Sequence, residues 1–397
     1  MRRAKPYDPE ARKGWARGLV HFHTRFSDGW ATVPRAAQIA AFHHYDFLIV
    51  TDHLRQMTTE RRHTLKGYVT TCEHVSREIG LPVIAGGEVE VDWMLPDDAS
   101  QAHTLVLSVR DFMDWSPPAP CPLAPWISAN NTGTVAQLQA LLSQRQLPSL
   151  AAHQFQHCLL RQDADFRYTI GDLGRSSFLD FFYSSAVDLL HEPEDISLVN
   201  GYATAQSPKG VYAGCDYHVG PESWPLAADF ALEARTMRKR WRKVFRSLSS
   251  LWLRFKGQAE TAACVQFAEE QLSHATYVYL GREECEEKSI LDAFRDGRTC
   301  ATRGETQFAE FKPIPSFTKR YPAGTEVRLH LPESYSQPRP RSVIVFRDGR
   351  AIHWQPVAMD NPDVVFAWQD PSPLPGLHVY QVAVPSKFVS SPILMGA

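Results

Sequence analysis

Residues 20–29, Val20-His21-Phe22-His23-Thr24-Arg25-Phe26-Ser27-Asp28-Gly29, join the end of an apolar run to a polar turn. Residues two apart on a strand point to the same face, so His21 and His23 are placed to hold one cation together. Ser27, Asp28 and Gly29 favour a tight reversal that brings a carboxylate back over the strand end. A pair of histidines alone often arises by chance, but this pair stands beside a turn at a strand-to-helix junction. The segment therefore predicts a metal site at the end of a strand.

Short apolar runs alternate with amphipathic stretches along most of the chain. Residues 33–44 and 134–146 carry helical patterns. Repetition of strand, helix and strand is typical of a parallel α/β arrangement, and this many runs fit a barrel better than an open sheet. The expected strands are residues 18–23, 46–53, 82–91, 102–109, 148–154, 178–185 and 210–218.

Asp52 and His53 close the second apolar run, Ile49-Val50-Thr51-Asp52-His53. Two titratable groups at the end of a buried strand are costly unless they are paired or bind a ligand. Neighbours on a strand point to opposite sides, so we expect His53 to face the metal. We expect Asp52 to orient a ligand or to transfer a proton.

Glu88 closes the third run, Ala85-Gly86-Gly87-Glu88-Val89-Glu90, where two glycines allow the backbone to approach closely. Glu90 is the competing carboxylate, because it shares the face of Glu88 on a regular strand.

Further ligand-type residues close the later runs. These are His103, His153 and the pair Asp216 and His218, which share one strand face while Cys215 points to the other. Each histidine alone is more often a hydrogen-bonded core residue than a ligand. Six runs that each end in His, Asp or Glu favour ligands, because parallel barrel strands open onto one face at their carboxyl ends. Cys215 is expected to be a small buried residue rather than a nucleophile, since no base partner is evident.

Composition limits the classes of protein that remain. The chain has 397 residues and a formal net charge of -2, which argues against a surface tuned throughout to nucleic acid. Its seven cysteines form no CxxC pair, which favours a reducing compartment. The N-terminal residues are basic but no apolar run follows them, and no stretch has the length of an apolar membrane span. We expect a soluble, cytoplasmic protein.

Residues 111–133 are rich in proline, include Trp115 and Trp126, and are expected to form a long loop. A loop of this length in a compact domain is often functional, so a lid over the site is one interpretation. A surface excursion packed by its own aromatic side chains is the other.

Residues 235–256, RTMRKRWRKVFRSLSSLWLRFK, form a basic helical pattern with one apolar stripe. A contact with a membrane surface or with nucleic acid is one interpretation. We favour an outer helix whose stripe packs on the protein, because one stripe opposite charges is what any surface helix has. The segment belongs to a helical insertion over about residues 231–275.

Helical patterns stop near residue 305, and the rest reads as short strands with proline-rich joints. Asp348-Gly349 stands between two apolar runs and predicts a hairpin. We therefore expect residues 1–304 to form the barrel and residues 305–397 to form a small all-β, sandwich-like module.

Several of these segments together resemble the PHP (polymerase and histidinol phosphatase) superfamily of metal-dependent hydrolases. In the family's order they are HFHTRFSDG, IVTDH, GGEVE, AHTLVLS, AAHQ and GCDYH, within about residues 18–220. Residues 277–304 resemble the stretch that closes the domain in many members. The appended β module makes the chain similar to the CehA/McbA-type branch, named for carbaryl hydrolases. The resemblance implies a distorted (β/α)7 barrel with up to three metal ions.

The resemblance also implies a ligand set for each ion. The first ion would take His21, His23, Glu88 and Asp216. The second would share Glu88 and add His103 and His153. The third would take Asp28, His53 and His218.

Histidine and carboxylate ligands without thiolate suit Zn, Mn or Fe. We expect a phosphoesterase that uses a metal-activated hydroxide on a phosphorylated small molecule, with Arg25 and Arg55 holding the phosphate. Solvated surface arginines are the alternative for both residues. The alternative functions are hydrolysis of carboxylic or carbamate esters, suggested by the branch, and a non-catalytic binding module stabilised by metal. Nucleic acid is not the favoured partner, and the oligomeric state stays open.

Overall fold

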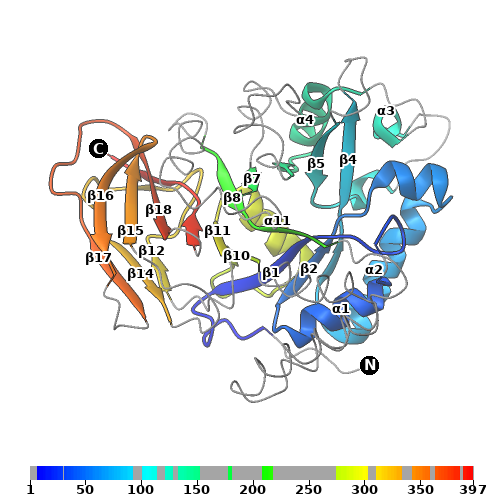
Figure 1. Cartoon of the computed structure of the whole chain (residues 1–397), viewed down its shortest axis with the longest axis horizontal. Coiled ribbons are helices and arrows are strands. Elements are labelled where there is room, and N and C mark those ends of the chain that lie inside the picture. The colour runs from blue at the N-terminus through cyan, green and yellow to red at the C-terminus, as the bar shows by residue number, and fades with distance from the viewer. Residues whose placement is uncertain are drawn as a thin grey trace, which may run out of the picture.

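The computed structural model describes most of the chain and forms a mixed α/β structure (Figure 1). The described residues are 7–29, 31–92, 101–113, 121–127, 133–152, 178–180, 208–217, 274–302, 310–332, 342–357, 363–384 and 388–396.

Four parallel strands form one end of the larger sheet, in the order β9-β1-β2-β3. Apolar side chains such as Val20 and Ile49 are fully buried on them. Parallel neighbours need a crossover, and helices α1 (Val33–Phe42) and α2 (Leu65–Ile79) supply the first two. The strands are β1 (Trp15–Phe22), β2 (Phe47–Val50), β3 (Val83–Ala85) and β9 (Gly214–Tyr217).

Threonine hydroxyls begin the helices that the sequence predicts. The Thr32 hydroxyl accepts a backbone N–H at the start of α1, and Thr134 forms a capping box at the start of α4 (Val135–Gln144). The predicted helices at 33–44 and 134–146 are thus confirmed. In both, the residue before the apolar pattern supplies the cap.

A second sheet follows the order β4-β5-β6-β7-β8. The β4–β5 and β5–β6 pairs are antiparallel, whereas β6–β7 and β7–β8 are parallel. The sequence-based expectation of parallel strands therefore fails at β4 and β5, since the eight residues 93–100 between them are too few for a crossover. These strands are β4 (Gly87–Asp92), β5 (Gln101–Val106), β6 (Ser149–Ala151), β7 (Phe178–Asp180) and β8 (Gly210–Tyr212).

The chain passes between the two sheets at two single residues, Gly86 after β3 and Ala213 after β8. A Cβ on Gly86 would lie 2.7 Å from the Val106 carbonyl oxygen and 2.9 Å from that of Val50. Only glycine fits this crossing without displacing backbone, as the sequence indicated. The described strands before residue 304 belong to two separate sheets, so the closed (β/α)7 barrel stays a prediction.

The C-terminal described residues, from 310 onward, contain only strands (left side of Figure 1). Three of them form a separate antiparallel sheet, β12-β14-β17, and the others extend the larger sheet. The all-β character predicted from the sequence agrees with this arrangement. The strands are β12 (Glu310–Lys312), β13 (Arg320–Tyr321), β14 (Val327–Leu331), β15 (Ser342–Arg347), β16 (Arg350–Pro356), β17 (Val364–Trp368), β18 (His378–Val384), β19 (Phe388–Ser390) and β20 (Ile393–Met395).

The predicted hairpin at Asp348-Gly349 is confirmed. Both residues have positive φ, 50° and 77°, as the tight turn between β15 and β16 requires. Hydrogen bonding also continues across residue 304, because β19 pairs with β11 (Thr299–Thr302), and β11 pairs with β10 (Ala275–Tyr279) beside β1. The division of the chain into residues 1–304 and 305–397 therefore stays a prediction.

Two sequence segments lie wholly or partly outside the described residues. The basic pattern at 235–256 is one of them. Within 111–133, residues 121–127 include the short helix α3 (Ala124–Ile127), which places the Trp126 side chain in the hydrophobic core instead of on a loop. None of the helices in the described ranges has both the length and the apolarity that a membrane crossing needs.

Candidate metal centre

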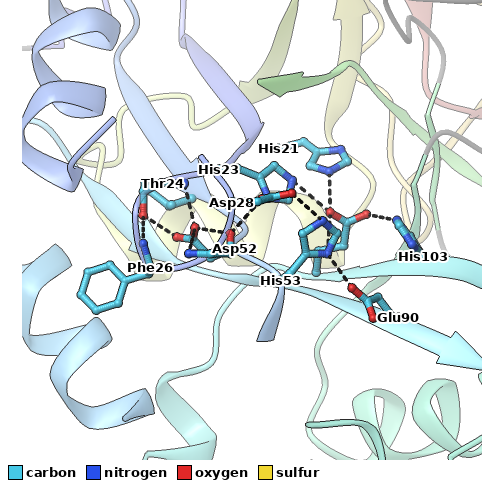
Figure 2. A network of polar contacts seen from close by, with 12 residues as sticks. His21, His23, Thr24, Phe26, Asp28, Asp52, His53, Glu90 and His103 are labelled. Carbon is cyan, nitrogen blue, oxygen red and sulfur yellow. Dashed lines mark hydrogen bonds and ion pairs between the residues drawn. The ribbon is translucent and has the colours of Figure 1, made fainter. Parts of the chain in front are cut away.

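The ends of four strands bring histidine and carboxylate side chains together (Figure 2). His21 lies on β1, Glu88 on β4 and His103 on β5, while His23 directly follows β1 and His53 lies three residues after the end of β2. A single parallel bridge pairs His53 with Glu88 and holds the two sheets together at this point.

Glu88 is the hub of this cluster. Its Oε2 atom lies 3.1 Å from His21 Nε2 and 3.0 Å from His23 Nε2, and its Oε1 atom lies 2.6 Å from His103 Nδ1. The glutamate is 1% exposed, so its charge depends on these neighbours for stabilisation. The two carboxylate oxygens thus face different histidines.

Asp28 approaches the same histidines from the turn after β1. Its Oδ1 atom lies 3.4 Å from His23 Nδ1, and its Oδ2 atom lies 3.6 Å from His53 Nε2. The Asp28 side chain is 36% exposed, so this side of the cluster opens toward solvent.

Among the described residues, three groups of side chains have ligand atoms within 4.8 Å of one another and are able to hold a metal ion. Each group shares a member with each of the others. The groups are His21, His23 and Glu88; His23, Asp28 and His53; and His53, Glu88 and His103.

The charge states in the cluster suit a cation. The pKa of His53 is lowered to about 3, mainly because burial penalises its charged form and also because His23 and His103 lie close. Burial alone would raise the pKa of Glu88, but the nearby His103, His53 and His21 hold it well below its usual value. A neutral imidazole and an ionised carboxylate are the forms that coordinate metals.

The backbone at His21 departs from the regular strand that the sequence suggested. His21 has φ of 69°, and the register of β1 shifts between Val20 and Phe22 against both β2 and β9. This β-bulge, rather than simple alternation, brings the His21 and His23 rings to a centroid distance of 5.2 Å. Such a left-handed residue costs energy, which neighbouring contacts must offset.

Gly29 lets the turn fold back onto β1. A Cβ at this position would lie 2.3 Å from the carbonyl carbon and oxygen of His23 and 2.5 Å from the Thr24 nitrogen. These are backbone atoms with no room to move. The Ser-Asp-Gly turn thus needs its glycine, and the turn places Asp28 beside His23.

Asp52 does not face the three ligand groups. Its carboxylate points to Thr24 and Ser27 in the turn after β1, on the other side of the strand end from His53 (Figure 2). The opposite orientations of Asp52 and His53 agree with the alternation expected from the sequence. The sequence analysis did not predict the partners of Asp52. The available signal was the two hydroxyl residues, Thr24 and Ser27, that follow the histidine pair.

Glu90 and the two arginines lie at the edge of the cluster. Glu90 Oε1 lies 3.3 Å from His53 Nδ1, and Glu90 Oε2 lies 3.6 Å from Arg55 Nη1. Arg25 is exposed on the turn before Asp28. Glu88, not Glu90, therefore occupies the centre.

The structure does not describe the side chains of the remaining predicted ligands. His153 and His218 lie outside the described residues, and Asp216 is described by its backbone alone. Asp216 lies on β9, next to Tyr217, whose backbone pairs with Phe22 of β1. Its register position is thus beside the histidine pair.

Comparisons with known proteins give low overall similarity. No protein-family model matches the chain, and no curated protein matches it. A two-domain protein from Bacteroides vulgatus, described as containing a PHP-like metal-dependent phosphoesterase, has 13% identity and a TM-score of 0.48 over 99% of both chains.

Two further structures are similar to about half of this chain. One is a suggested metal-dependent phosphoesterase from Bifidobacterium adolescentis, with 16% identity and a TM-score of 0.34. The other is an amidohydrolase from Chromobacterium violaceum with bound sulfate and no metal, with 14% identity and a TM-score of 0.32. Each covers 51% of this chain and 87% of its own. With similarity at this level, the described side chains themselves are what indicate a function.

Proposed function

We propose that this chain is a metal-dependent hydrolase that acts as a phosphoesterase on a small phosphorylated molecule. The observation that carries the proposal is the gathering of six ligand-type side chains into three overlapping groups around the buried Glu88. Buried histidines and carboxylates in such a cluster are costly unless they are paired with one another or with a cation.

The donor set fits divalent ions. Four imidazoles and two carboxylates, without thiolate, suit Zn, Mn or Fe. When bound, such ions lower the pKa of a water molecule and neutralise charge that grows on phosphoryl oxygens. His153, Asp216 and His218 would complete the ligand sets that the family resemblance implies.

The two oxygens of Glu88 support a shared ligand. Oε2 faces His21 and His23, whereas Oε1 faces His103, so one carboxylate is oriented toward two neighbouring sites. Asp28 and His53 would hold a third ion on the more open side. Adjacent ions held in this way favour hydrolytic chemistry over a purely structural role.

Arg55 and Arg25 are the proposed phosphate-binding cations. Arg55 is 30% exposed and lies beside Glu90, which also approaches His53, so its guanidinium is at the edge of the cluster. A guanidinium presents paired N–H donors that match phosphoryl oxygens. Arg25, on the exposed turn, is the second candidate.

Metal analysis joined to a substrate panel tests the proposal. Purified full-length protein loaded with Zn²⁺, Mn²⁺ or Fe²⁺ would be assayed against an aryl phosphate monoester, an aryl phosphodiester, an aryl acetate and a naphthyl carbamate. We expect phosphoester turnover that EDTA abolishes and that Glu88→Gln removes.

Turnover of only the acetate or carbamate would overturn the phosphoesterase and favour a carbonyl-ester hydrolase. Bound metal with no turnover of any substrate would favour the metal-stabilised binding module. A chain that binds no metal would overturn the whole proposal.

A further inference from the structure

Asp52 is a fully buried carboxylate that the three ligand groups do not use. Its Oδ1 atom accepts hydrogen bonds from the Thr24 backbone N–H at 2.7 Å, the Ser27 backbone N–H at 3.1 Å and the Ser27 hydroxyl at 2.6 Å. Its Oδ2 atom accepts one from the Thr24 hydroxyl at 2.7 Å. All four donors belong to the turn that joins His23 to Asp28.

The four hydrogen bonds to Asp52 hold the turn in place and occupy both oxygens of the carboxylate. A buried carboxylate is tolerated only where hydrogen bonds replace its hydration, and charge-assisted bonds of this length are strong. Because the acceptor sits at the end of β2 and the donors follow β1, the carboxylate fastens two strand ends together. His53, the next residue, then faces the cluster from the same strand end.

Ser27 connects Asp52 to Asp28. The Ser27 hydroxyl lies 2.6 Å from Asp52 and 3.2 Å from Asp28 Oδ1, and its single proton is therefore best placed toward Asp52. Phe26, which lies between Thr24 and Ser27 in the sequence, packs against Tyr68 of α2 with 4.9 Å between the ring centroids. The turn is thus held by the hydrogen bonds to Asp52 and by the aromatic contact of Phe26 with Tyr68.

We propose that Asp52 is a positioning residue that acts through Asp28. By holding Thr24 and Ser27, it fixes the direction in which Asp28 presents its carboxylate to His23 and His53. The sequence left two roles open for Asp52, orienting a metal ligand and transferring a proton. The proposed role is the first: Asp52 orients Asp28 through the turn and transfers no proton to a substrate. The inference rests on the proposed function only in taking Asp28 as a metal ligand.

Titration of the metal-free, full-length protein with Co²⁺ tests this role, with calorimetry for affinity and visible absorption for the coordination environment. Asp52→Asn removes the charge that strengthens all four hydrogen bonds and places an amide N–H opposite the Thr24 hydroxyl, which weakens the hold on the turn. We expect one Co²⁺ to bind roughly 10- to 100-fold more weakly, with its absorption band altered, while other bound ions are unchanged. Ser27→Ala, a milder change, should give a smaller loss at the same ion.

A double-mutant cycle separates positioning from general destabilisation. If Asp52 acts through Asp28, then Asp52→Asn added to Asp28→Ala should weaken Co²⁺ binding no further than Asp28→Ala alone. Thr299→Val is the matched control, because Thr299 is fully buried and its hydroxyl lies 2.7 Å from the Val211 carbonyl oxygen and 2.6 Å from the Ser391 hydroxyl, beside β10. It should lower Tm without changing any Co²⁺ affinity.

Additive effects in the cycle, or equal weakening of every ion by Asp52→Asn, would overturn the positioning role. An Asp52→Asn protein that binds all ions normally would overturn it as well. Wild-type protein that binds Co²⁺ but hydrolyses nothing would overturn the proposed function alone. Wild-type protein that binds no ion would overturn both.

Discussion

The thiol of Cys215 lies 2.8 Å from the carbonyl oxygen of His21, so β9 supports β1 at the bulge that presents His21 to Glu88. The bulge turns this carbonyl out of the regular ladder, and a buried carbonyl needs a donor. Cys215 is fully buried, as the sequence indicated.

Cys215→Ala should therefore weaken both the fold and the metal centre. We expect a stability loss of about 1 kcal/mol from the lost hydrogen bond, together with weaker metal binding as His21 becomes less ordered. Chemical denaturation and Co²⁺ titration measure the two effects. Cys300→Ala, which removes another fully buried thiol from β11, is the control and should lower stability alone. Unchanged metal affinity in Cys215→Ala would show that the bulge holds its geometry without the thiol.

Gly29→Ala should displace the turn that carries Asp28. The new Cβ would lie 2.3 Å from the His23 carbonyl, and overpacking against backbone typically costs about 1–3 kcal/mol. Thermal unfolding and metal content measure the change, with Gly67→Ala at an exposed position in α2 as the control. Normal metal content in Gly29→Ala would contradict the tight packing of this turn on β1.

Glu88→Gln and Glu90→Gln compare the same chemical change at two positions of one strand. Glu88 has four histidines within 3.7 Å of its two oxygens, whereas Glu90 approaches His53 and Arg55 at the edge. We expect Glu90→Gln to lower metal affinity within the roughly 10- to 100-fold range of supporting residues, and Glu88→Gln to exceed it. Metal analysis after dialysis measures both. A larger effect from Glu90→Gln would mean that Glu90 is the central ligand.

Metal-free protein should lose stability as the pH falls from neutral. The pKa of His53 is about 3 in the folded state against 6.5 ordinarily, so between these values only the unfolded chain binds the proton. Stability then rises with pH in this window, by up to about 1.4 kcal/mol per pH unit for one group. The pKa of Glu88 is also lowered in the folded state. Ionisation of Glu88 therefore also makes stability fall as the pH drops below the usual pKa of a glutamate.

Denaturation of EDTA-treated protein at pH 7.0, 5.5 and 4.5 measures this slope. These three values span about the range over which histidine titrates. His53→Gln cannot take up the proton and should give a flatter dependence than wild type. Equal slopes for the two proteins would contradict a neutral, buried His53.

Removal of residues 305–397 should prevent folding of the remaining chain. β19 pairs with β11 through Ala301 and Val389, and the Ser391 hydroxyl accepts the backbone N–H of Val211 at 2.9 Å. Truncation would expose this edge of the larger sheet and the apolar residues beneath it. Circular dichroism and gel filtration of residues 1–304 measure the outcome. A soluble, metal-binding fragment would instead support two independently folding units.

Much of the strand order along the chain follows from local patterns. The run at 46–53 contains β2, and the pattern at 134–146 contains α4, because apolar periodicity and a capping threonine act within a few residues. The hairpin at Asp348-Gly349 was predictable for the same reason, since two positive φ values suit these two residue types. The antiparallel β4–β5 pair was missed, because strand direction depends on partners and connections and not on strand composition.

For the candidate site, the sequence by itself determined which residue types stand at the ends of the strands. It placed His21, His23 and His53 where apolar runs stop, because burial selects the runs and a turn must follow each one. Glu88 and His103 lie instead near the beginnings of β4 and β5. Only the tertiary structure decided which atoms meet. The bulge at His21, the divided contacts of Glu88 and the attachment of Asp52 to Thr24 and Ser27 all depend on register between segments far apart in the chain. No local pattern carries that information, since register is set by packing and hydrogen bonds across the whole sheet.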